Sequence, residues 1–412
     1  MGTTLEDARR LDGEDVLAGF RDRFARGEDP IAYLDGNSLG RPPRATLDRL
    51  REVLEVEWGG ALIRSWSTGW TELPLRVGDL LGASVLGADE GQTVVADSTS
   101  VNIYKALHAA AGLRAGRSEI VVTEADFPTD RYLVQAVADQ RGLTVRWLAS
   151  SERGGVAAED LARVLSESTA VVLLSHVDYR SGYLADLPGI TAAVRDAGAV
   201  MVWDLSHSAG VVPMGLDASG VDFAVGCTYK YLNAGPGAPA FLYAARRHLA
   251  VVEQPVPGWF GAADIFSMAA ELTPAPDARR MLSGTPSVLG IVAVEEGVRL
   301  IAEAGIDRIR AKAITLTELA IELVDAWLAP LGAILRSPRD PRVRGAHVTV
   351  ELPDARAVTD ELIARGVVPD YRNPDMIRLG LSPLSTSFEE TWTALDVLRD
   401  VLTARVGRVQ PA

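Results

Sequence analysis

Lysine is almost missing from this sequence. The 41 lysines and arginines include only three lysines, Lys105, Lys230 and Lys312, which leaves 38 arginines. Arginine keeps its charge under all ordinary conditions, whereas the pKa of a lysine can fall far enough for its amine to act as a nucleophile. This chain takes nearly all of its positive charge from arginine but keeps Lys230 at the end of an expected strand. The amine of Lys230 is therefore a candidate nucleophile.

Cysteine and long apolar runs are scarce as well. The single cysteine, Cys227, excludes an internal disulfide framework and fits a reducing compartment, so we expect a cytoplasmic protein. No apolar run approaches the roughly 18 residues that a membrane-spanning helix needs. The opening MGTTLEDARRLDGEDV is acidic, with no basic segment before an apolar stretch, so we expect no secretory signal.

The charge and the histidines exclude further classes of partner. A net charge of −14 argues against nucleic acid or an anionic membrane as the main partner. The five histidines have no paired helical spacing and no cysteine companions, so we expect no metal site. A small molecule therefore remains as the expected ligand, and an anionic one would need local cations or helix N-termini.

Two domains are expected from the length of 412 residues, because single cores stop growing at roughly 250–300 residues. Helical patterns cover about 6–27 and 44–58. From Gly91 onward, short Val-rich apolar runs alternate with helical stretches, which predicts a mainly parallel sheet covered on both faces. After residue 286 a long helical region and then mixed strands and helices predict a small α+β domain. The expected division is an N-terminal arm with helices over 1–58, a large α/β domain over 59–300 and a small α+β domain over 301–412.

Polar residues follow several expected strands, where open α/β sheets bind their ligands. Ser98, Thr99 and Ser100 follow QTVVAD and begin a helical stretch, so their hydroxyls and free N–H groups could hold a phosphate. Taken alone, this motif is explained more simply by an N-cap. Phe127 and Asp130 follow the next strand, where a turn with another cap is an equal alternative.

A buried strand, AVMVWD, ends in Asp204, and His207 follows three residues later. A buried acid costs free energy unless a cation or strong donor pairs with it. The protonated nitrogen of a pyridine ring would serve, as would an arginine or a helix terminus. Lys230 comes 26 residues after Asp204 at a later strand end, followed by GPGAP. A phosphate-binding helix start, a stacking aromatic, an acid and a lysine together indicate a pyridoxal 5′-phosphate (PLP) site.

The chain resembles the kynureninases, PLP hydrolases of fold type I in the aminotransferase class V group. The strings that carry the resemblance are YLDGNSLGRPP (33–43), DSTSVN (97–102), FPTD (127–130), SHVDYRSG (175–182), WDLSHSAG (203–210), GCTYKYLNAGPGAPAFLY (226–243), PGWFG (257–261) and IRLGLSPL (377–384). YLDGNSLG and TYKYLN–GPGAP are specific to this branch more than to fold type I at large. The fold implied is a large PLP-binding domain with a mainly parallel sheet and a smaller α+β domain.

The resemblance implies a role for each matched residue. Lys230 would bind the cofactor covalently and move the substrate's α-proton, and Tyr229 would act as an acid in later proton transfers. The other cofactor-binding residues implied are Thr99, Ser100 and Tyr229 at the phosphate, Phe127 on the ring, Asp204 at the ring nitrogen, and Thr129, Asp130, Ser175 and His207 around them. Trp259 and Thr285 would reach in from the second subunit of a homodimer. Arg378 would grip the α-carboxylate of the amino-acid substrate, and Asn37 and Ser38 would cover the mouth of the site.

The reaction implied is hydrolysis of the Cβ–Cγ bond of L-kynurenine or a ring-substituted kynurenine such as 3-hydroxykynurenine, giving an anthranilate and L-alanine. Ala262 stands after GWFG, where the family commonly has histidine, so the accepted ring substituents stay open, as does the choice between tryptophan catabolism and biosynthesis. A class V desulfurase or β-lyase and an aminotransferase are alternatives within the fold. Cys227, three residues before Lys230 in an expected strand, argues against the desulfurase. The alternative that is not an enzyme is a binding or regulatory protein that retains the fold without catalysis.

Overall fold

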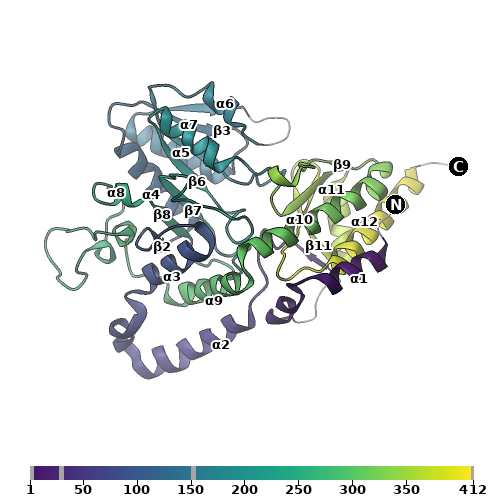
Figure 1. Ribbon diagram of the computed structural model, residues 1–412, viewed down its shortest axis with the longest axis horizontal. Helices are drawn as coiled ribbons and strands as arrows, with labels where there is room; N and C mark the ends of the chain where they lie inside the picture. The colour runs from purple at the N-terminus through teal and green to yellow at the C-terminus, as the bar shows by residue number, and fades with distance from the viewer. Residues whose placement is uncertain (1–3, 27–31, 150–154, 410–412) are drawn as a thin grey trace.

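The computed structural model describes residues 4–26, 32–149 and 155–409 and consists of two lobes (Figure 1). The larger lobe contains a seven-stranded sheet and the smaller lobe a five-stranded sheet. Helix α9 (Val288–Ala304) lies in the larger lobe, and α10 (Ile306–Leu323) continues from it into the smaller one. Both described chain ends lie in the smaller lobe.

The large sheet has the strand order β2-β8-β7-β6-β5-β3-β4. Its strands are β2 (Thr93–Val95), β3 (Glu119–Thr123), β4 (Thr144–Leu148), β5 (Thr169–Ser175), β6 (Val200–Asp204), β7 (Phe223–Gly226) and β8 (Phe241–Ala244). β8 runs antiparallel to both of its neighbours, and the other neighbouring pairs are parallel. The mainly parallel sheet expected from the sequence is confirmed.

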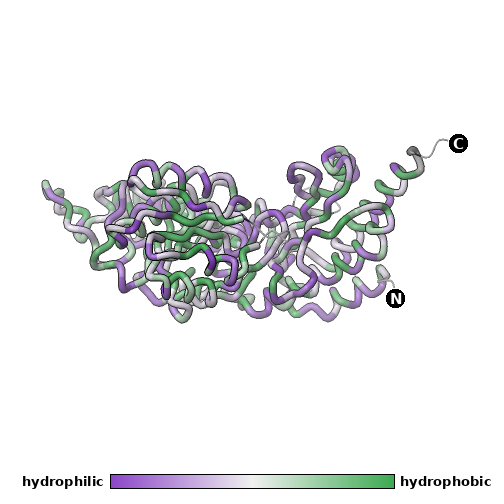
Figure 2. Tube along the Cα trace, turned by 90° about the horizontal axis from the view of Figure 1, so that it is seen from above, coloured by the Kyte–Doolittle hydropathy of each residue, from purple (hydrophilic) through white to green (hydrophobic). Residues whose placement is uncertain are grey.

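Both faces of this sheet are covered, because its central strands are apolar on each side. In β5, Val171 and Leu173 belong to the apolar cluster that includes side chains of α4 (Thr99–Gly112) and α5 (Pro128–Arg141). Val172 and Leu174 belong to the opposite cluster, with α9 and α7 (Leu187–Asp196). Alternate residues of a strand point to opposite faces, and Figure 2 shows hydrophobic residues concentrated in the interior of the larger lobe.

The small sheet has the order β1-β11-β12-β10-β9. Its elements are β1 (Ala32–Leu34), β9 (Ile334–Leu335), β10 (His347–Glu351), β11 (Val367–Arg372) and β12 (Met376–Gly380), with helices α1 (Leu5–Glu14), α11 (Ala355–Ala364) and α12 (Phe388–Val409). β1 pairs in parallel with β11, so the N-terminal part of the chain completes the C-terminal sheet. The division at residues 58 and 300 stays a prediction.

Several helices differ from the lengths that the sequence pattern predicts. The opening helix ends at Glu14 instead of near residue 27, because the Asp15 carboxylate accepts a hydrogen bond from the N–H of Leu17 (2.8 Å) and turns the chain. The long helical region breaks at Gly305, whose φ of 83° is the left-handed conformation that glycine adopts readily.

The remaining helical segments are η1 (Ala18–Arg23), α2 (Arg44–Glu52), η2 (Val53–Ala61), η3 (Leu62–Arg64), η4 (Trp66–Trp70), α3 (Leu73–Leu81), η5 (Gly82–Leu86), α6 (Ala158–Ala162), α8 (Arg246–Leu249), η6 (Trp259–Gly261), η7 (Ala278–Met281), η8 (Val324–Leu328), η9 (Ala329–Leu331) and η10 (Pro341–Val343).

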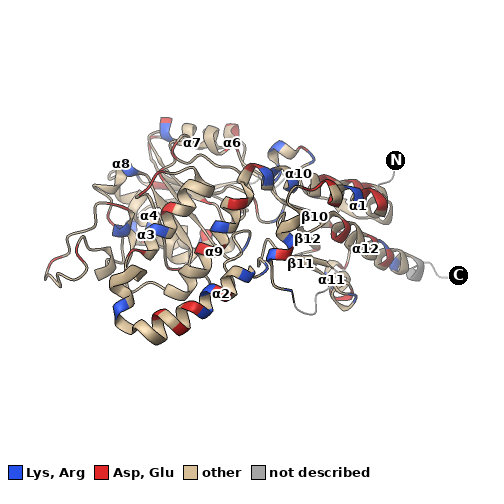
Figure 3. Cartoon of the chain, turned by 60° about the horizontal axis from the view of Figure 1, so that its bottom comes forward, with Lys and Arg blue, Asp and Glu red and all other residues tan. Residues whose placement is uncertain are grey.

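The surface is charged and of mixed sign where Figure 3 displays it. Basic and acidic residues alternate along α2 and α12. Exposed ion pairs of this kind contribute little stability individually, about 0–1 kcal/mol each. Within the described ranges, no helix combines the length and the apolar character needed to cross a membrane.

Candidate active site

A cavity of about 100 Å³ lies at the carboxyl ends of β5 and β6 and beside the turn after β7. Ser175 and Asp204, the last residues of β5 and β6, are paired in register, so their side chains reach the same edge of the sheet. The cavity is lined by Thr99, Ser100, Ile103, Phe127, Thr129, Asp130, Ser175, Tyr179, Asp204, Ser206, His207, Tyr229 and Lys230. All the expected cofactor residues are therefore gathered here, except Trp259 and Thr285.

Lys230 points its amine at a buried histidine. Its Nζ lies 2.9 Å from Nε2 of His207. Burial, and then the cation of Lys230, hold the pKa of His207 well below its ordinary value, so the ring is neutral and Nε2 can accept a hydrogen bond from the ammonium. The amine is thus held at the cavity by a neutral acceptor.

The GNSLG turn packs directly on the lysine turn. The N–H of Gly40 donates a 2.7 Å hydrogen bond to the carbonyl of Tyr229. A Cβ at Gly40 would collide with the Lys230 carbonyl and with Asn233, so only glycine allows this approach. The motif at the start of the chain therefore helps to fix the backbone that carries Lys230.

Three buried acids stand together beside the amine. Burial, and then the carboxylates of Asp204 and Asp126, raise the pKa of Asp130 well above its ordinary value. A raised pKa favours a proton on Asp130, beside the carboxyl group of Asp204. Asp204 also accepts a 2.8 Å bond from the N–H of Ser206. With a proton on Asp130, the neighbouring Asp204 is the carboxyl group available for a protonated ring nitrogen.

Asp126 belongs to the same cluster and was not singled out from the sequence. It accepts hydrogen bonds from the N–H groups of Thr123 (3.3 Å) and Ser175 (3.1 Å), and so joins the ends of β3 and β5. Burial raises its pKa to about 7. In the sequence, the only indication of Asp126 is its position close to a strand end in EIVVTEADFPTD, near Asp130.

Helix α4 begins at the cavity. Ser98 is its N-cap and accepts a 3.4 Å bond from the N–H of Val101, while the Ser98 carbonyl accepts the N–H of Asn102 (2.9 Å). The first N–H groups of a helix have no acceptor within the helix, and here the two that remain belong to Thr99 and Ser100. The N-cap alternative thus holds for Ser98, and Thr99 and Ser100 face the cavity with both hydroxyl and N–H groups.

Lys105, for which the sequence indicated no special role, lies beneath this helix start. Its side chain is fully buried, and Nζ lies 2.7 Å from a carboxylate oxygen of Asp97 and 2.8 Å from the carbonyl of Met281. Asp97 has a φ of 53°, so the chain makes a left-handed turn just before Ser98. Lys105 therefore joins the turn before α4 to the segment that leads to Thr285.

Arg378, from β12 of the small sheet, lies next to the cavity without lining it. Its side chain is 1% exposed and donates to the carbonyl of Tyr179 (2.6 Å) and to Oγ of Ser38 (2.8 Å). Asp370 pairs with the same guanidinium at 2.6 Å. Because Tyr179 lines the cavity, the structure places Arg378 and Ser38 at its border. Asn37 is fully buried on the same side, against Gly380.

Trp259 and Thr285 are not brought into the cavity of their own chain. Trp259 is 40% exposed and packs edge-on against Phe260, and Thr285 is exposed on the surface. Phe127 is in the cavity but is 40% exposed, with its ring edge-on to Tyr179 at 5.3 Å. Trp259 and Thr285 could therefore contribute only to the cavity of a second subunit.

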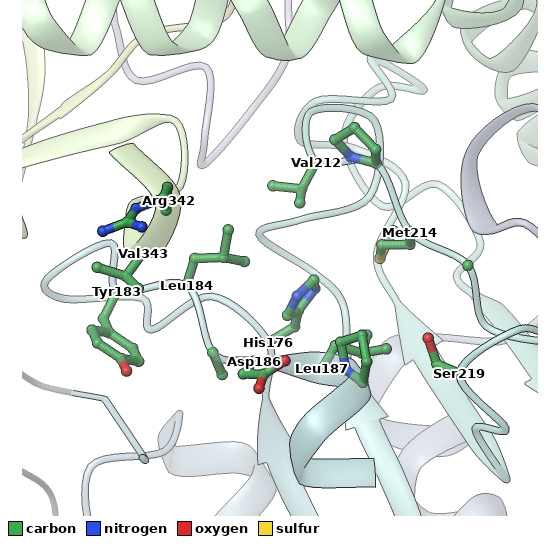
Figure 4. Close-up of a pocket in the computed structure, with 14 residues that line it drawn as sticks. His176, Tyr183, Leu184, Asp186, Leu187, Val212, Met214, Ser219, Arg342 and Val343 are labelled. Carbon is green, nitrogen blue, oxygen red and sulfur yellow. The ribbon is translucent and has the colours of Figure 1, made fainter. Parts of the chain in front are cut away.

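A separate cavity of about 410 Å³ lies around His176 (Figure 4). Figure 4 shows the His176 ring among the lining residues, with Leu184 and Met214 above it and Leu187 below it. Burial lowers the pKa of His176 to about 3, so the ring is neutral. His176 follows Ser175 in sequence but lines this cavity instead of the one at Lys230. His176 is therefore not among the residues that line the active-site cavity.

The residues of the smaller cavity fit PLP. Lys230 offers an amine for the aldehyde, the start of α4 offers N–H and hydroxyl groups for the phosphate, and Asp204 offers a carboxylate for the ring nitrogen. Among the residues that the structure describes, Nδ1 of His207 and Oδ2 of Asp130 are buried without a hydrogen-bond partner. Buried polar atoms of this kind are satisfied in nearly all proteins, so they indicate a bound polar molecule or water.

Comparisons with known proteins give matches over nearly the whole chain. Residues 309–398 match the family model described as the kynureninase C-terminal domain. The chain is 43% identical over 407 residues to a kynureninase of Pseudomonas fluorescens, which covers 97% of this chain and 96% of that protein. It is 42% identical over 414 residues to a kynureninase of Burkholderia pseudomallei strain 1106a, which covers 98% of this chain and 97% of that protein.

Solved structures share the fold at lower identity. A cysteine desulfurase of Thermococcus onnurineus NA1 superposes with a TM-score of 0.79 at 18% identity, covering 98% of this chain and all of that one. A C-DES variant with glycine covalently linked to its PLP cofactor gives a TM-score of 0.81 at 19% identity, covering 92% of this chain and 99% of that one. At this identity the likeness establishes the fold alone.

Proposed function

The chain belongs to the kynureninase family, and from this premise we propose that it hydrolyses the Cβ–Cγ bond of L-kynurenine or a ring-substituted kynurenine, releasing an anthranilate and L-alanine. The single observation that carries the proposal is the Lys230 amine, held 2.9 Å from a neutral His207 in a cavity that also contains the acids and the helix start. PLP is the cofactor of this family, and when bound it supplies an electron sink for the carbanions that the reaction requires.

The proposed roles follow from where each side chain lies. Lys230 holds the cofactor covalently and, once its amine is free, moves the substrate's α-proton. Thr99 and Ser100 hold the phosphate through the start of α4, and Tyr229 lies in the same cavity. Asp204, which lines the cavity beside Asp130, holds the ring nitrogen. Thr129, Ser175, His207 and Phe127 complete the cofactor's surroundings.

Substrate binding is proposed for the residues that the small sheet brings to the cavity. Arg378 presents a guanidinium that can hold the α-carboxylate with two parallel hydrogen bonds. Ser38 already contacts that guanidinium, and Asn37 lies beside it, so the GNSLG turn closes the site over the bound amino acid. Burial raises the pKa of Tyr229, so its phenol stays protonated at neutral pH and can donate a proton late in the reaction.

The structure gives a reason against desulfurase chemistry. Desulfurases act through a cysteine on a mobile loop, and this chain has one cysteine. Cys227 is 3% exposed, its N–H donates to Ser206, and burial raises the pKa of its thiol. A thiol that is buried and protonated is a poor nucleophile, so hydrolysis at carbon remains the better proposal.

The active unit is proposed to be a cytoplasmic homodimer with shared active sites. Trp259 and Thr285 are the residues that would complete the partner's cofactor site, and both are exposed in one chain. Exposed apolar side chains gather on the segment that follows α2 and on the segment after Trp259. They are Leu54, Val56, Trp58, Leu62, Ile63, Phe266, Met268 and Leu272. Apolar surface of this extent commonly marks an interface between proteins.

Product analysis tests the proposed reaction. The purified protein with PLP is incubated with L-kynurenine and, separately, with 3-hydroxykynurenine, and the amino-acid and aryl products are quantified. We expect equal amounts of alanine and the corresponding anthranilate, and loss of both with Lys230→Ala. A keto acid as the main product would replace the proposal with transamination. Sulfide from cysteine, without cleavage of kynurenine, would replace it with desulfuration.

A further inference from the structure

Polar atoms without partners gather where the small sheet meets the cavity. Within the described parts of the chain, both ring nitrogens of His347, both amide atoms of Asn37 and Nδ1 of His207 are buried with no hydrogen-bond partner. His347 and Asn37 have no exposed surface. Leaving so many buried donors and acceptors unpaired costs free energy, so this is a place that binds polar molecules.

His347 lies on the same face of the small sheet as Arg378. It is the first residue of β10 and is paired with Gly380 on β12, while Thr349 is paired with Arg378. Opposed residues of two strands, and alternate residues of one strand, share a face. The backbone of Gly182 closes another side of the ring, since a Cβ there would lie 3.2 Å from Nε2. The His347 ring is therefore fixed by its surroundings although its nitrogens are free.

The His347 ring also faces the lysine side of the site. Its centroid lies 5.6 Å from that of His207, whose Nε2 contacts Lys230. Burial, and then the cations of Arg378 and Lys230, hold the pKa of His347 well below its ordinary value. A neutral imidazole has one donor and one acceptor nitrogen. His347 therefore offers a hydrogen-bond donor and an acceptor between Arg378, which is proposed to hold the α-carboxylate, and Lys230, which is proposed to move the α-proton.

We propose that His347, together with His207, binds the water molecule that the hydrolysis consumes. The proposal rests on the proposed function, because only the proposed hydrolysis adds water to the γ-carbonyl carbon of the substrate, whereas transamination uses its water to release the keto acid. A buried water needs two to four polar partners. His207 Nδ1, the His347 nitrogens and the Asn37 amide supply them at the border of the cavity. None of the motifs in the sequence marks His347, which stands in the expected strand GAHVTVELP.

The test separates the steps before water attack from the step that uses water. His347→Leu and His347→Gln are compared with wild type, each with PLP bound, for exchange of the substrate's α-hydrogen with deuterated solvent and for release of anthranilate. His347→Leu is expected to lower anthranilate release by roughly 100-fold, the usual effect of losing one positioned polar group. The α-hydrogen exchange should change by less than about threefold, because it depends on Lys230 and Arg378. His347→Gln, which keeps a donor and an acceptor, should recover part of the release.

His248→Leu is the matched control. His248 is also buried, bonded to Asp222 at 2.7 Å and stacked on Phe223, but it lies outside the site. It should lower thermal stability without changing the ratio of release to exchange. A readout without turnover is diffraction from the PLP-bound protein, where we expect an ordered water within hydrogen-bond distance of both His207 and His347 in wild type and not in His347→Leu.

Three results would overturn the water site. In the first, His347→Leu loses α-hydrogen exchange and anthranilate release equally and has a raised KM, which would make His347 a substrate-binding residue. Another is unchanged release in that variant, and the third is a wild-type structure in which no water contacts the two rings. A failure of the proposed function is distinguishable, because wild type itself would then exchange the α-hydrogen and release no anthranilate.

Discussion

The Nζ of Lys105 lies 2.7 Å from the carboxylate of Asp97, beneath the first turn of α4. The same amine holds the carbonyl of Met281 at 2.8 Å. One buried cation thus joins the turn that presents Thr99 and Ser100 to the segment that leads toward Thr285. The proposed phosphate end of the site is therefore held by a residue that does not line the cavity.

Lys105→Met should weaken PLP more than it weakens pyridoxal, which lacks the phosphate. Without the cation, the turn at Asp97 loses its partner and the hydroxyl and N–H groups of Thr99 are no longer fixed. We expect the Kd of PLP to rise by roughly tenfold, or ~1.4 kcal/mol, with a smaller change for pyridoxal. Titration of the apoprotein with each compound, followed by absorbance, measures both constants.

Lys312→Met is the matched control, because Lys312, on α10, is another buried lysine, 2.7 Å from Asp15, and does not line the cavity. Breaking this pair should lower stability by about 3–5 kcal/mol. It should leave the preference for PLP over pyridoxal unchanged. An equal loss of preference in both variants would mean that Lys105 acts only through overall stability.

Asp126 makes stability depend on pH. Its pKa is raised from 3.8 to about 7 in the folded protein, so the folded chain keeps a proton that the unfolded chain releases. The stability that this proton provides is complete below pH 3.8 and is lost as the pH rises toward 7. The shift corresponds to on the order of 4 kcal/mol.

Asp126→Asn removes this titration, so the stability of wild type relative to the variant should fall as the pH rises through that window. Urea unfolding of both proteins at about pH 4.5 and about pH 7.5 measures the difference. A difference that is the same at both values would show that Asp126 does not bind the proton.

Arg378→Lys should raise KM for kynurenine by roughly 10- to 100-fold, because an ammonium cannot make the paired hydrogen bonds that a guanidinium makes to a carboxylate. The absorbance of the bound cofactor should not change, since Arg378 does not line the cofactor cavity. Arg372→Lys is the control, because Arg372 pairs with the same Asp370 from β11. If the two variants raise KM equally, the proposed contact with the α-carboxylate is wrong.

Shared active sites predict that two inactive variants restore activity when mixed. A hybrid of Lys230→Ala with Trp259→Ala carries both defects in one site and has one intact site, so an equal mixture should recover about a quarter of wild-type activity. Lys230→Ala with Phe127→Ala should recover nothing, because Phe127 lines the cavity of its own chain. If both mixtures recover the same activity, or if neither recovers any, Trp259 is not shared between the active sites.

The sequence was sufficient for those features that depend on neighbouring residues. Apolar runs that end in Asp204 or lead to Lys230 identify buried parallel strands and the edge where a ligand binds, because strand period and strand ends are local properties. The scarcity of lysine added a chemical reason for Lys230 before any geometry was known. These two signals predicted a cofactor site at the carboxyl edge of the sheet, where Asp204 and Lys230 line one cavity.

Features that depend on contacts between distant segments could not be predicted. β1 joins the small sheet through pairing with β11, more than 300 residues later, and no local pattern encodes that partner. Lys105 looks like an ordinary helical lysine until Asp97 and Met281 are folded around it. His347 stands in an apolar strand whose partner strand carries Arg378, and only the register shows that they share a face. The helix expected to reach residue 27 was predicted too long because the turn at Asp15 depends on a single side-chain hydrogen bond.

The most direct test is to find which lysine binds the cofactor. The PLP-bound protein is reduced with borohydride, digested and mapped by mass spectrometry, and its three lysines make the assignment simple. We predict a pyridoxyl group on Lys230 and none on Lys105 or Lys312, whose amines are buried in ion pairs. A label on either of those residues, or no label on Lys230, would contradict the account.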